Sequence, residues 1–325
     1  MKLHWLLGME LSQYLQEQQI PFEHNVQLSE KTWIKTGGVC AYWVAPQSVE
    51  QLAEICRFLY ANSISFDLVG KTSNLFFHSI YNPQVVVSTV NVNNYEIKDD
   101  IVTCDCGVSV IKLSKDCMTH GYSGFYGIVG LPGTVASAVV NNASCFGCSI
   151  SSLLISADVL MPDGSVRTME KEEFGYTKRS SVFKRKEVMG VVLSVKLKLQ
   201  RASNIDEEQL KAENTKAWRS VHQEGYANNL GSIYAKKQMK RNVKNILSVI
   251  CFKAADWLGF SSPAVIQKRM LLWLYGEGDL DHYISDKNLN IFIWRDRKAE
   301  QAFERYKQFM SKIYHGLEIE IEEKI

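Results

Sequence analysis

Long hydrophobic runs are absent from this chain of 325 residues. The early apolar stretch Trp5-Leu6-Leu7 is far too short for the core of an export signal or for a membrane span. We therefore expect no membrane insertion and a cytoplasmic location.

An excess of charge of one sign is also lacking, because 37 Lys and Arg side chains are balanced by 35 Asp and Glu, a formal net charge of +2. This balance offers no support for nucleic-acid binding. The hydrophobic share of 46% is ample for packed cores. At this length we expect two domains, or three. No feature of the sequence identifies a protein partner.

Standard nucleotide and zinc motifs are missing too. The chain has neither the GxGxxG dinucleotide fingerprint nor a Walker A loop. Its Cys-x-x-Cys, at Cys145 and Cys148, has no second pair and no neighbouring His, which argues against zinc. It does not follow the opening strand of a βαβ unit, as a thioredoxin-like redox pair would. We expect no metal and eight reduced, packing cysteines, which are typical of a reducing compartment.

The chain does contain two glycine-rich turns. One covers residues 70–75, after the apolar run 64–69, and the other covers residues 130–138. Glycine adopts backbone angles that other residues avoid, and proline restricts them. The backbone N–H groups of such turns can seat a diphosphate, to which Lys71 could add a point charge. Either turn alone would be interpreted as an ordinary strand-to-helix connection.

The remaining pattern predicts a mixed α+β architecture rather than a doubly wound sheet. Ser48 with Gln51 is expected to form a capping box that opens a helix over 48–60. Further helices are expected over 9–20, 108–120 (ending at Gly121), 200–226 and 299–313 (ending at Gly316), and strands over 64–69, 84–89, 101–106, 154–161, 188–199, 289–294 and 317–321. We expect an N-terminal helix (1–22), a domain over 23–200 and a smaller domain over 201–325.

Four motifs in one order carry a resemblance to a known family. They are Lys-Thr-Trp-Ile-Lys-Thr-Gly-Gly (31–38), the turn at 70–75, the segment 130–147 and Arg-x-Ser-x-Phe-Lys (179–184). In this series the chain resembles the UDP-N-acetylenolpyruvoylglucosamine reductases, also called UDP-N-acetylmuramate dehydrogenases, over residues 24–200 and less beyond. The resemblance implies a two-lobed FAD-binding domain of the vanillyl-alcohol-oxidase/PCMH type, followed by a smaller α+β substrate-binding domain.

The resemblance also implies a reaction. NADPH reduces FAD, and the flavin passes a hydride to UDP-N-acetylglucosamine enolpyruvate, which gives UDP-N-acetylmuramate for peptidoglycan and cell-wall biogenesis. The cofactor supplies the hydride and the protein supplies alignment and polarity. We expect FAD to be bound without a covalent link. The residues that stand in the family's FAD-binding motifs are Thr36, Gly70, Lys71, Thr72, Ser73, Asn74, Leu75, Gly130, Pro132, Gly133, Thr134, Ala136, Ser137, Asn142, Phe146, Gly147 and Val192.

Such a reaction needs a positive charge and an acid near the substrate carboxylate, together with a positioned proton donor. Arg179 matches the family's arginine, and a permanently charged guanidinium suits a carboxylate. Ser232 resembles the proton-donating serine. Glu322 fits the terminal acid, although Glu318 and Glu320 share its strand face by the period of two. The alternative readings are a surface arginine in a basic run, a common Gly-Ser turn and a solvated acidic edge strand.

Departures from the family pattern concentrate on the substrate side. The tyrosine that usually precedes the arginine is Lys178 here, with Tyr176 two positions earlier as the candidate substrate contact. Lys236 stands within the family's Lys-Asn-Pro segment and could meet a diphosphate. The family's His-x-Asn-Phe strand has no His at the corresponding residues 290–293. Two alternatives follow: an FAD-dependent paralogue that acts on a different nucleotide sugar in surface polysaccharide synthesis, and a flavin-binding protein without turnover.

Overall fold

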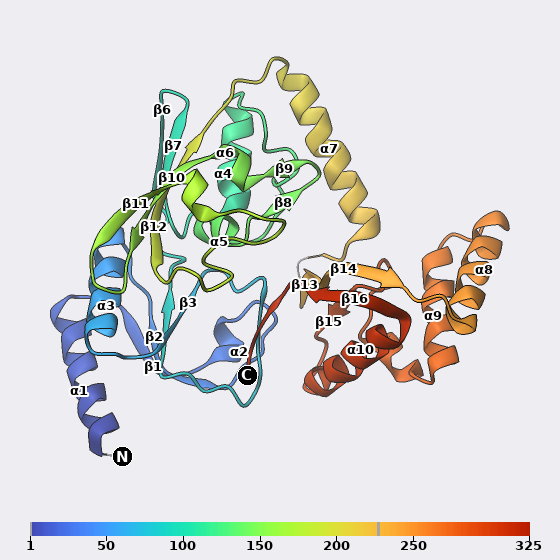
Figure 1. Ribbon diagram of the computed structural model, residues 1–325, viewed down its shortest axis with the longest axis horizontal. Coiled ribbons are helices and arrows are strands. Elements are labelled where there is room, and N and C mark those ends of the chain that lie inside the picture. Colours follow the sequence, from blue (N-terminus) through green and yellow to red (C-terminus); the bar gives the residue numbers. More distant parts are fainter. Residues whose placement is uncertain (1, 226–227) are drawn as a thin grey trace. The chain divides into compact units, whose positions relative to one another are not determined.

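The computed structural model describes every residue except 1, 226 and 227, and it divides into two compact units (Figure 1). The first comprises Met1–Glu30, Gly38–Thr72 and Tyr81–Lys216, and the second comprises Lys31–Gly37, Ser73–Ile80 and Ala217–Ile325. Both units mix helices with strands, which confirms the predicted α+β class. Two short segments from the N-terminal half thus fold with the C-terminal residues.

The first lobe of the first unit is a four-stranded sheet in the order β1-β2-β5-β3. β5 pairs in parallel with β2 and β3, whereas β1 runs antiparallel to β2. The four residues of β5 are all buried, as expected for an inner strand that is covered on both faces. The elements of this part are α1 (Lys2–Glu17), β1 (Phe22–Gln27), α2 (Leu28–Lys31), β2 (Val39–Val44), α3 (Val49–Ala61), β3 (Phe66–Val69) and β5 (Val85–Ser88).

The second lobe of the first unit is an antiparallel five-stranded sheet in the order β11-β10-β12-β7-β6. Apolar residues of this sheet and of α4 and α5 share one core cluster, which includes Val102, Leu113, Val139 and Val195. The elements are β6 (Tyr95–Lys98), β7 (Ile101–Asp105), α4 (Val110–Thr119), α5 (Val135–Val140), β8 (Ser144–Cys145), β9 (Cys148–Ser149), α6 (Ile150–Leu153), β10 (Leu154–Leu160), β11 (Val166–Glu170), the 3-10 helix η1 (Lys171–Phe174), β12 (Val191–Lys198) and α7 (Ile205–His222).

The second unit is built around α10, whose apolar face supplies the fully buried Phe303 and Tyr306. Three two-stranded pairs accompany it: β13 with β15, β14 with β16, and β17 with β4, the last in parallel. The elements are β4 (Leu75–Phe77), β13 (Asn229–Ser232), β14 (Tyr234–Met239), α8 (Val243–Trp257), α9 (Pro263–Tyr275), the 3-10 helix η2 (Gly278–His282), β15 (Ile291–Ile293), α10 (Ala299–Ile313), β16 (Tyr314–Ile319) and β17 (Glu322–Lys324). In Figure 1, α8 and α9 form an orange helical hairpin within this unit.

Two local predictions about helix ends are wrong. Ser48 does cap α3 by accepting from the Gln51 N–H at 3.3 Å, but the Gln51 side chain accepts from the Gln47 N–H at 2.9 Å, so the reciprocal half of the capping box is missing. Gly316 does not end α10, which stops at Ile313; Gly316 lies inside β16 with φ of 61°. The chain enters β16 directly after α10 and pairs with β14, so the helix ends without a glycine cap.

Other expected elements form with shifted bounds. Gly121, with φ of 80°, follows α4 as predicted. The helix expected over 200–226 is α7, and residue 226 lies outside the described residues. β11 and the α8–α9 hairpin were not anticipated. None of the helices in the described parts of the chain is both long and apolar enough to cross a membrane.

Candidate functional site

The turn that follows β3 packs directly against the second glycine-rich turn. A Cβ added at Gly70 would stand only 2.8 Å from Thr134 Oγ1. Lys71 donates from Nζ to Ser109 Oγ at 2.8 Å, and Ser109 in turn forms a β-bridge with Thr134. The fold of the first unit therefore brings together two turns that are far apart in the sequence.

The first turn also contains a strained residue. Thr72 is buried and has φ of 53°. This left-handed conformation is an outlier for a β-branched side chain, whereas glycine, which the family motif has here, adopts it freely. Backbone strain of this kind is concentrated at ligand-binding turns, where the surrounding structure holds it in place.

The second turn uses the first amides of α5 within the protein. Thr134 and Ser137 form a reciprocal capping box, with each side-chain oxygen accepting from the other residue's N–H. The Val135 N–H donates to Val108 O at 2.8 Å and the Ala136 N–H to Cys106 O at 3.1 Å. The expectation that the opening of this helix offers its N–H groups to a diphosphate is therefore wrong for these four residues.

Other donors near the two turns remain available. No hydrogen bond among the described residues uses the backbone N–H of Gly70, Lys71 or Gly133. Gly133 has φ of 129°, which only glycine adopts readily. The Lys71 side chain is partly buried, and this burial lowers the pKa of its ammonium. Three amides and one cation therefore stand where an anionic group could bind.

Two predicted residues carry buried polar atoms without a partner among the described residues. They are Asn142 Oδ1 and the Tyr176 hydroxyl, and burial raises the pKa of Tyr176 well above its usual range. Asn142 Nδ2 is used, because it donates to Thr177 O at 2.7 Å. A buried polar atom without a hydrogen bond costs free energy, of order 1–3 kcal/mol, so both atoms are natural contacts for a bound ligand.

Arg179 lies on a tight turn that is tied to the end of α5. Thr177 and Ser180 exchange two backbone hydrogen bonds across this turn, and Arg179 itself has φ of 58°. Ser181 Oγ donates to Val140 O at 2.6 Å. The arginine motif and the helix that follows the second turn are therefore held together in the first unit.

Three further candidates of the first unit lie in a hairpin turn and in a strand. Phe146 and Gly147, both with positive φ, form the turn of the β8–β9 hairpin, and Val192 is buried in β12. Ser109 is the residue that sequence reasoning missed. It precedes α4 and so reads as an ordinary N-cap, but its hydroxyl makes no capping hydrogen bond and accepts from Lys71 instead.

Three catalytic or substrate candidates lie in the second unit, together with Asn74. Asn74 Nδ2 donates to Glu320 O at 3.2 Å, and Asn74 O accepts from the Glu322 N–H at 2.9 Å. The Glu320 N–H donates to the carbonyl of Ile233, the residue after Ser232, at 2.8 Å. This unit therefore gathers Asn74, Ser232 and the C-terminal acids around the ends of β13 and β16.

The charged candidates of this region are paired. The Glu322 side chain is 58% exposed and lies 2.8 Å from Lys324 Nζ, while Lys236 Nζ lies 2.7 Å from Glu318 Oε1. Exposed pairs of this kind contribute little to stability and exchange partners easily. Thr36 also belongs to this unit, and its Oγ1 is buried without a hydrogen-bond partner among the described residues.

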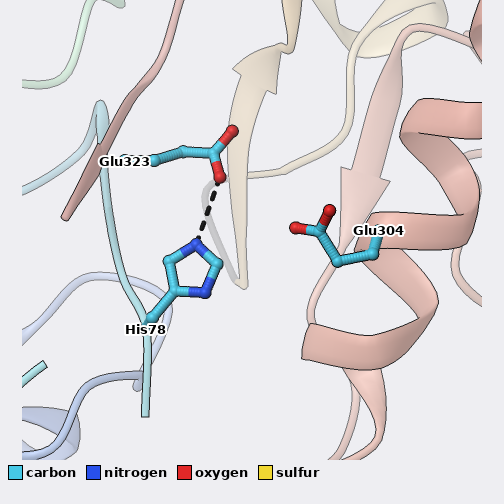
Figure 2. A group of neighbouring side chains, drawn as sticks. All are labelled: His78, Glu304 and Glu323. Carbon is cyan, nitrogen blue, oxygen red and sulfur yellow. Dashed lines mark hydrogen bonds and ion pairs between the residues drawn. The ribbon is translucent and has the colours of Figure 1, made fainter. Parts of the chain in front are cut away.

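A histidine between carboxylates lies elsewhere in the second unit. His78 Nε2 is 3.1 Å from Glu323 Oε2, and Glu304 on α10 faces this pair (Figure 2). Ligand atoms of these three residues lie within 4.8 Å of one another, the only such group among the residues that the structure describes. The Lys307 ammonium lies 2.8 Å from Glu304 and 3.0 Å from Glu323. The cluster is thus an ion-pair network in which lysine already supplies the cation.

Comparison with known proteins identifies the first unit. Residues 40–170 match the family model "FAD binding domain", which covers the first turn and the second. A UDP-N-acetylenolpyruvoylglucosamine reductase of Nostoc sp. is 34% identical over 157 residues, or 48% of this chain and 47% of the relative. A UDP-N-acetylenolpyruvoylglucosamine reductase 2 of Bacillus cereus is 30% identical over 156 residues, which are 48% of this chain and 51% of the relative. The chain spans about half the length of the curated relatives that it matches.

A solved structure extends the likeness to the whole fold. The UDP-N-acetylenolpyruvylglucosamine reductase of Thermus caldophilus aligns with a TM-score of 0.66 over 94% of this chain and 100% of that chain, at 20% identity. At this identity the alignment establishes the fold only. Because it covers 94% of this chain, the alignment extends into the second unit.

The residues of the first unit suit an FAD diphosphate. Three amides that no hydrogen bond among the described residues uses, together with the Lys71 ammonium, lie at two adjoining turns. The same unit contains two buried polar atoms without a hydrogen-bond partner among those residues, Asn142 Oδ1 and the Tyr176 hydroxyl. The family match covers both turns and the cysteine hairpin between β8 and β9. Residues 40–170 therefore form an FAD-binding domain, and over about half of its length the chain is similar to UDP-N-acetylenolpyruvoylglucosamine reductases.

Proposed function

We propose that the protein is an NADPH-dependent flavin oxidoreductase that reduces the enolpyruvyl group of UDP-N-acetylglucosamine enolpyruvate in peptidoglycan precursor synthesis. The observation that carries the proposal is the packing of Gly70 against Thr134, which joins both turns within a domain that matches the FAD binding family. NADPH rather than NADH, and this nucleotide sugar as substrate, are parts of the proposal that rest on the family resemblance.

FAD, when bound, supplies hydride transfer, and the residues of the first unit hold it. The amides of Gly70, Lys71 and Gly133 would donate to the diphosphate, and the Lys71 ammonium would neutralise part of its charge. We propose that the flavin is not covalently attached. Burial raises the pKa of the Cys148 thiol, which disfavours the nucleophilic thiolate, and no histidine lies in either turn.

Three side chains are proposed to act on the substrate. Arg179 would stabilise the negative charge that develops on the carboxylate side of the enolpyruvyl group, Glu322 would assist as a protonated acid that donates a hydrogen bond, and Ser232 Oγ would deliver the proton to the neighbouring carbon. Arg179 is held on its turn by the Thr177–Ser180 hydrogen bonds, and Ser232 by the pairing of β13 with β15. Tyr176, with its buried hydroxyl, and Lys236 are proposed to contact the substrate.

A second candidate function keeps the flavin and changes the nucleotide sugar, for example in surface polysaccharide synthesis. Its support is the second unit, where the α8–α9 hairpin occupies the region that departs most from the family pattern. Lys236, the candidate diphosphate contact, is also paired with Glu318 at 2.7 Å. The third candidate is a flavin-binding protein without turnover.

A spectroscopic experiment separates these functions. The purified protein should show the two visible absorption bands of oxidised flavin, and a colourless preparation that takes up no added FAD would reject all three candidates. NADPH should bleach the flavin in a stopped-flow instrument, and UDP-N-acetylglucosamine enolpyruvate should restore its colour. Bleaching without recovery would favour another nucleotide sugar, and absence of bleaching by either nicotinamide cofactor would favour a binding protein.

We also propose a cytoplasmic location. No disulfide links any of the eight cysteines, all of which lie in the described part of the chain, and six of them are buried. Such cysteine usage is typical of a reducing compartment. Alkylation of the denatured protein, taken directly from cells under acid quench, should modify all eight thiols; protected thiols would contradict the proposal.

A further inference from the structure

The outward face of α8 is apolar. Large hydrophobic side chains recur along it at intervals of three and four residues, so they form one stripe on the helix surface. Trp257 is 85% exposed and Val243 is 73% exposed. The stripe, with the turn that continues it, consists of Val243, Ile246, Leu247, Ile250, Trp257, Leu258 and Phe260, all of which are exposed. We call this set the α8 stripe.

Hydrogen bonds hold the inward face of α8 against the rest of the second unit, and they keep the α8 stripe on the outward face. Asn245 and Ser248 are both buried. Asn245 Nδ2 donates to Lys240 O at 2.8 Å and to Ile313 O at 2.9 Å, and its Oδ1 accepts from the Tyr275 hydroxyl at 2.9 Å. Rotation of the helix would leave these buried groups without hydrogen-bond partners, which is unfavourable. The tertiary contacts themselves therefore hold an apolar surface toward the outside.

Positive charge surrounds the stripe. Between residues 240 and 260 the chain has four basic side chains and a single acidic one: Lys240, Arg241, Lys244 and Lys253 against Asp256. The two cations of α9, Lys268 and Arg269, are paired with Asp281 and Asp286 and do not add to this charge. At 100° per residue, Lys244 and Lys253 fall on opposite sides of the α8 stripe. The chain as a whole is nearly neutral at +2, so this charge is a local property of α8 and the residues beside it.

We propose that the α8 stripe is a docking surface for the face of an anionic phospholipid bilayer. An apolar helix face bordered by cations, with tryptophan among its exposed residues, is the pattern of helices that lie in the membrane interface. A protein partner would need a complementary acidic rim, whereas an anionic leaflet attracts every nearby cation at once. α8 has 15 residues, too few to span a hydrocarbon core, so it lies along the surface.

The test uses the full chain and vesicles of defined composition. Sedimentation with phosphatidylcholine vesicles that contain phosphatidylglycerol should carry the protein into the pellet, and added sodium chloride should reduce the bound fraction. Ile250→Glu should weaken binding at least about tenfold, because it places a charge where an isoleucine would be buried. Val221→Glu, an equivalent change at an exposed position of α7, should bind as the parent does. Lys253→Glu should weaken binding and flatten its salt dependence.

The opposite results would overturn the proposal. Failure of the parent protein to bind the anionic vesicles, or equal binding to pure phosphatidylcholine, would reject an anionic membrane as the occupant. A concentration-dependent dimer in analytical ultracentrifugation that Ile250→Glu abolishes, without vesicle binding by the parent, would assign the stripe to a second copy of the chain. Thermal unfolding of Ile250→Glu should match that of the parent, because the side chain is exposed in the folded protein. These outcomes do not depend on whether the flavin reaction is the one proposed above.

Discussion

Gly70→Ala is the most direct test of the idea that the two turns act as one site. The substitution adds a single methyl group, and the backbone at position 70 is not in the left-handed region, so alanine itself is compatible with it. The new Cβ would lie 2.8 Å from Thr134 Oγ1 and 3.0 Å from Thr134 Cγ2, where ordinary contact begins at 3.4 Å. The two turns must therefore separate by roughly 0.6 Å, a shift that overpacked interiors resist.

Thr134 cannot avoid the methyl group by rotating. Its Oγ1 accepts from the Ser137 N–H and so caps α5, a contact that is worth about 1 kcal/mol. Overpacking costs about 1–3 kcal/mol, which should appear as a lower midpoint of thermal unfolding. Displaced amides would also lose hydrogen bonds to a charged diphosphate, each worth about 1.5–3 kcal/mol, so FAD affinity should fall about tenfold to a hundredfold.

The assay is a fluorescence titration of the apoprotein with FAD, beside a thermal unfolding curve for each variant. Gly278→Ala is the matched control, because a Cβ there meets no atom within 4 Å, and it should bind FAD as the parent does. Thr134→Ser combined with Gly70→Ala removes the methyl group at 3.0 Å and keeps the capping oxygen, so affinity should partly recover. Unchanged FAD affinity in Gly70→Ala would refute the reasoning, whatever happens to stability.

Three further substitutions have defined outcomes. Gly107→Ala would place Cβ 1.8 Å from Thr89 O and 2.6 Å from Val92 O, so it should destabilise the fold by at least about 3 kcal/mol in denaturant unfolding; a smaller loss would show that this segment can open. Lys71→Met should lower FAD affinity about tenfold. Because burial lowers the pKa of Lys71, the parent should lose its ammonium, and with it FAD affinity, at a lower pH than an ordinary lysine would, and the variant should not show this loss of affinity. A pH profile of FAD affinity that matches the parent's would exclude Lys71 from the site. Ser232→Ala should leave bleaching by NADPH intact and slow reoxidation by the enolpyruvyl nucleotide sugar at least about a hundredfold, measured by stopped flow; unchanged reoxidation would remove Ser232 from proton transfer.

Local signals in the sequence were sufficient for much of the first unit. The Ser48 cap, the period of α3, the apolar run of β3 and the left-handed Gly121 all depend on residues within one or two turns of chain. The helix of the last segment, α10, was equally visible from its apolar face. Prediction was wrong where a distant strand decided the outcome, as at Gly316, whose segment pairs with β14.

The sequence by itself was sufficient to predict the cofactor class of this protein, because four local motifs stand in the order of a known family, although neither glycine-rich turn would have been sufficient alone. Only the tertiary structure decided that Gly70 meets Thr134, that Lys71 reaches Ser109, and that the first amides of α5 are already used. It also decided that the apolar face of α8 points outward, since the buried Asn245 finds its partners on other elements. Hydrogen bonds and packing between distant segments carry this information, and no periodicity of a single segment contains it.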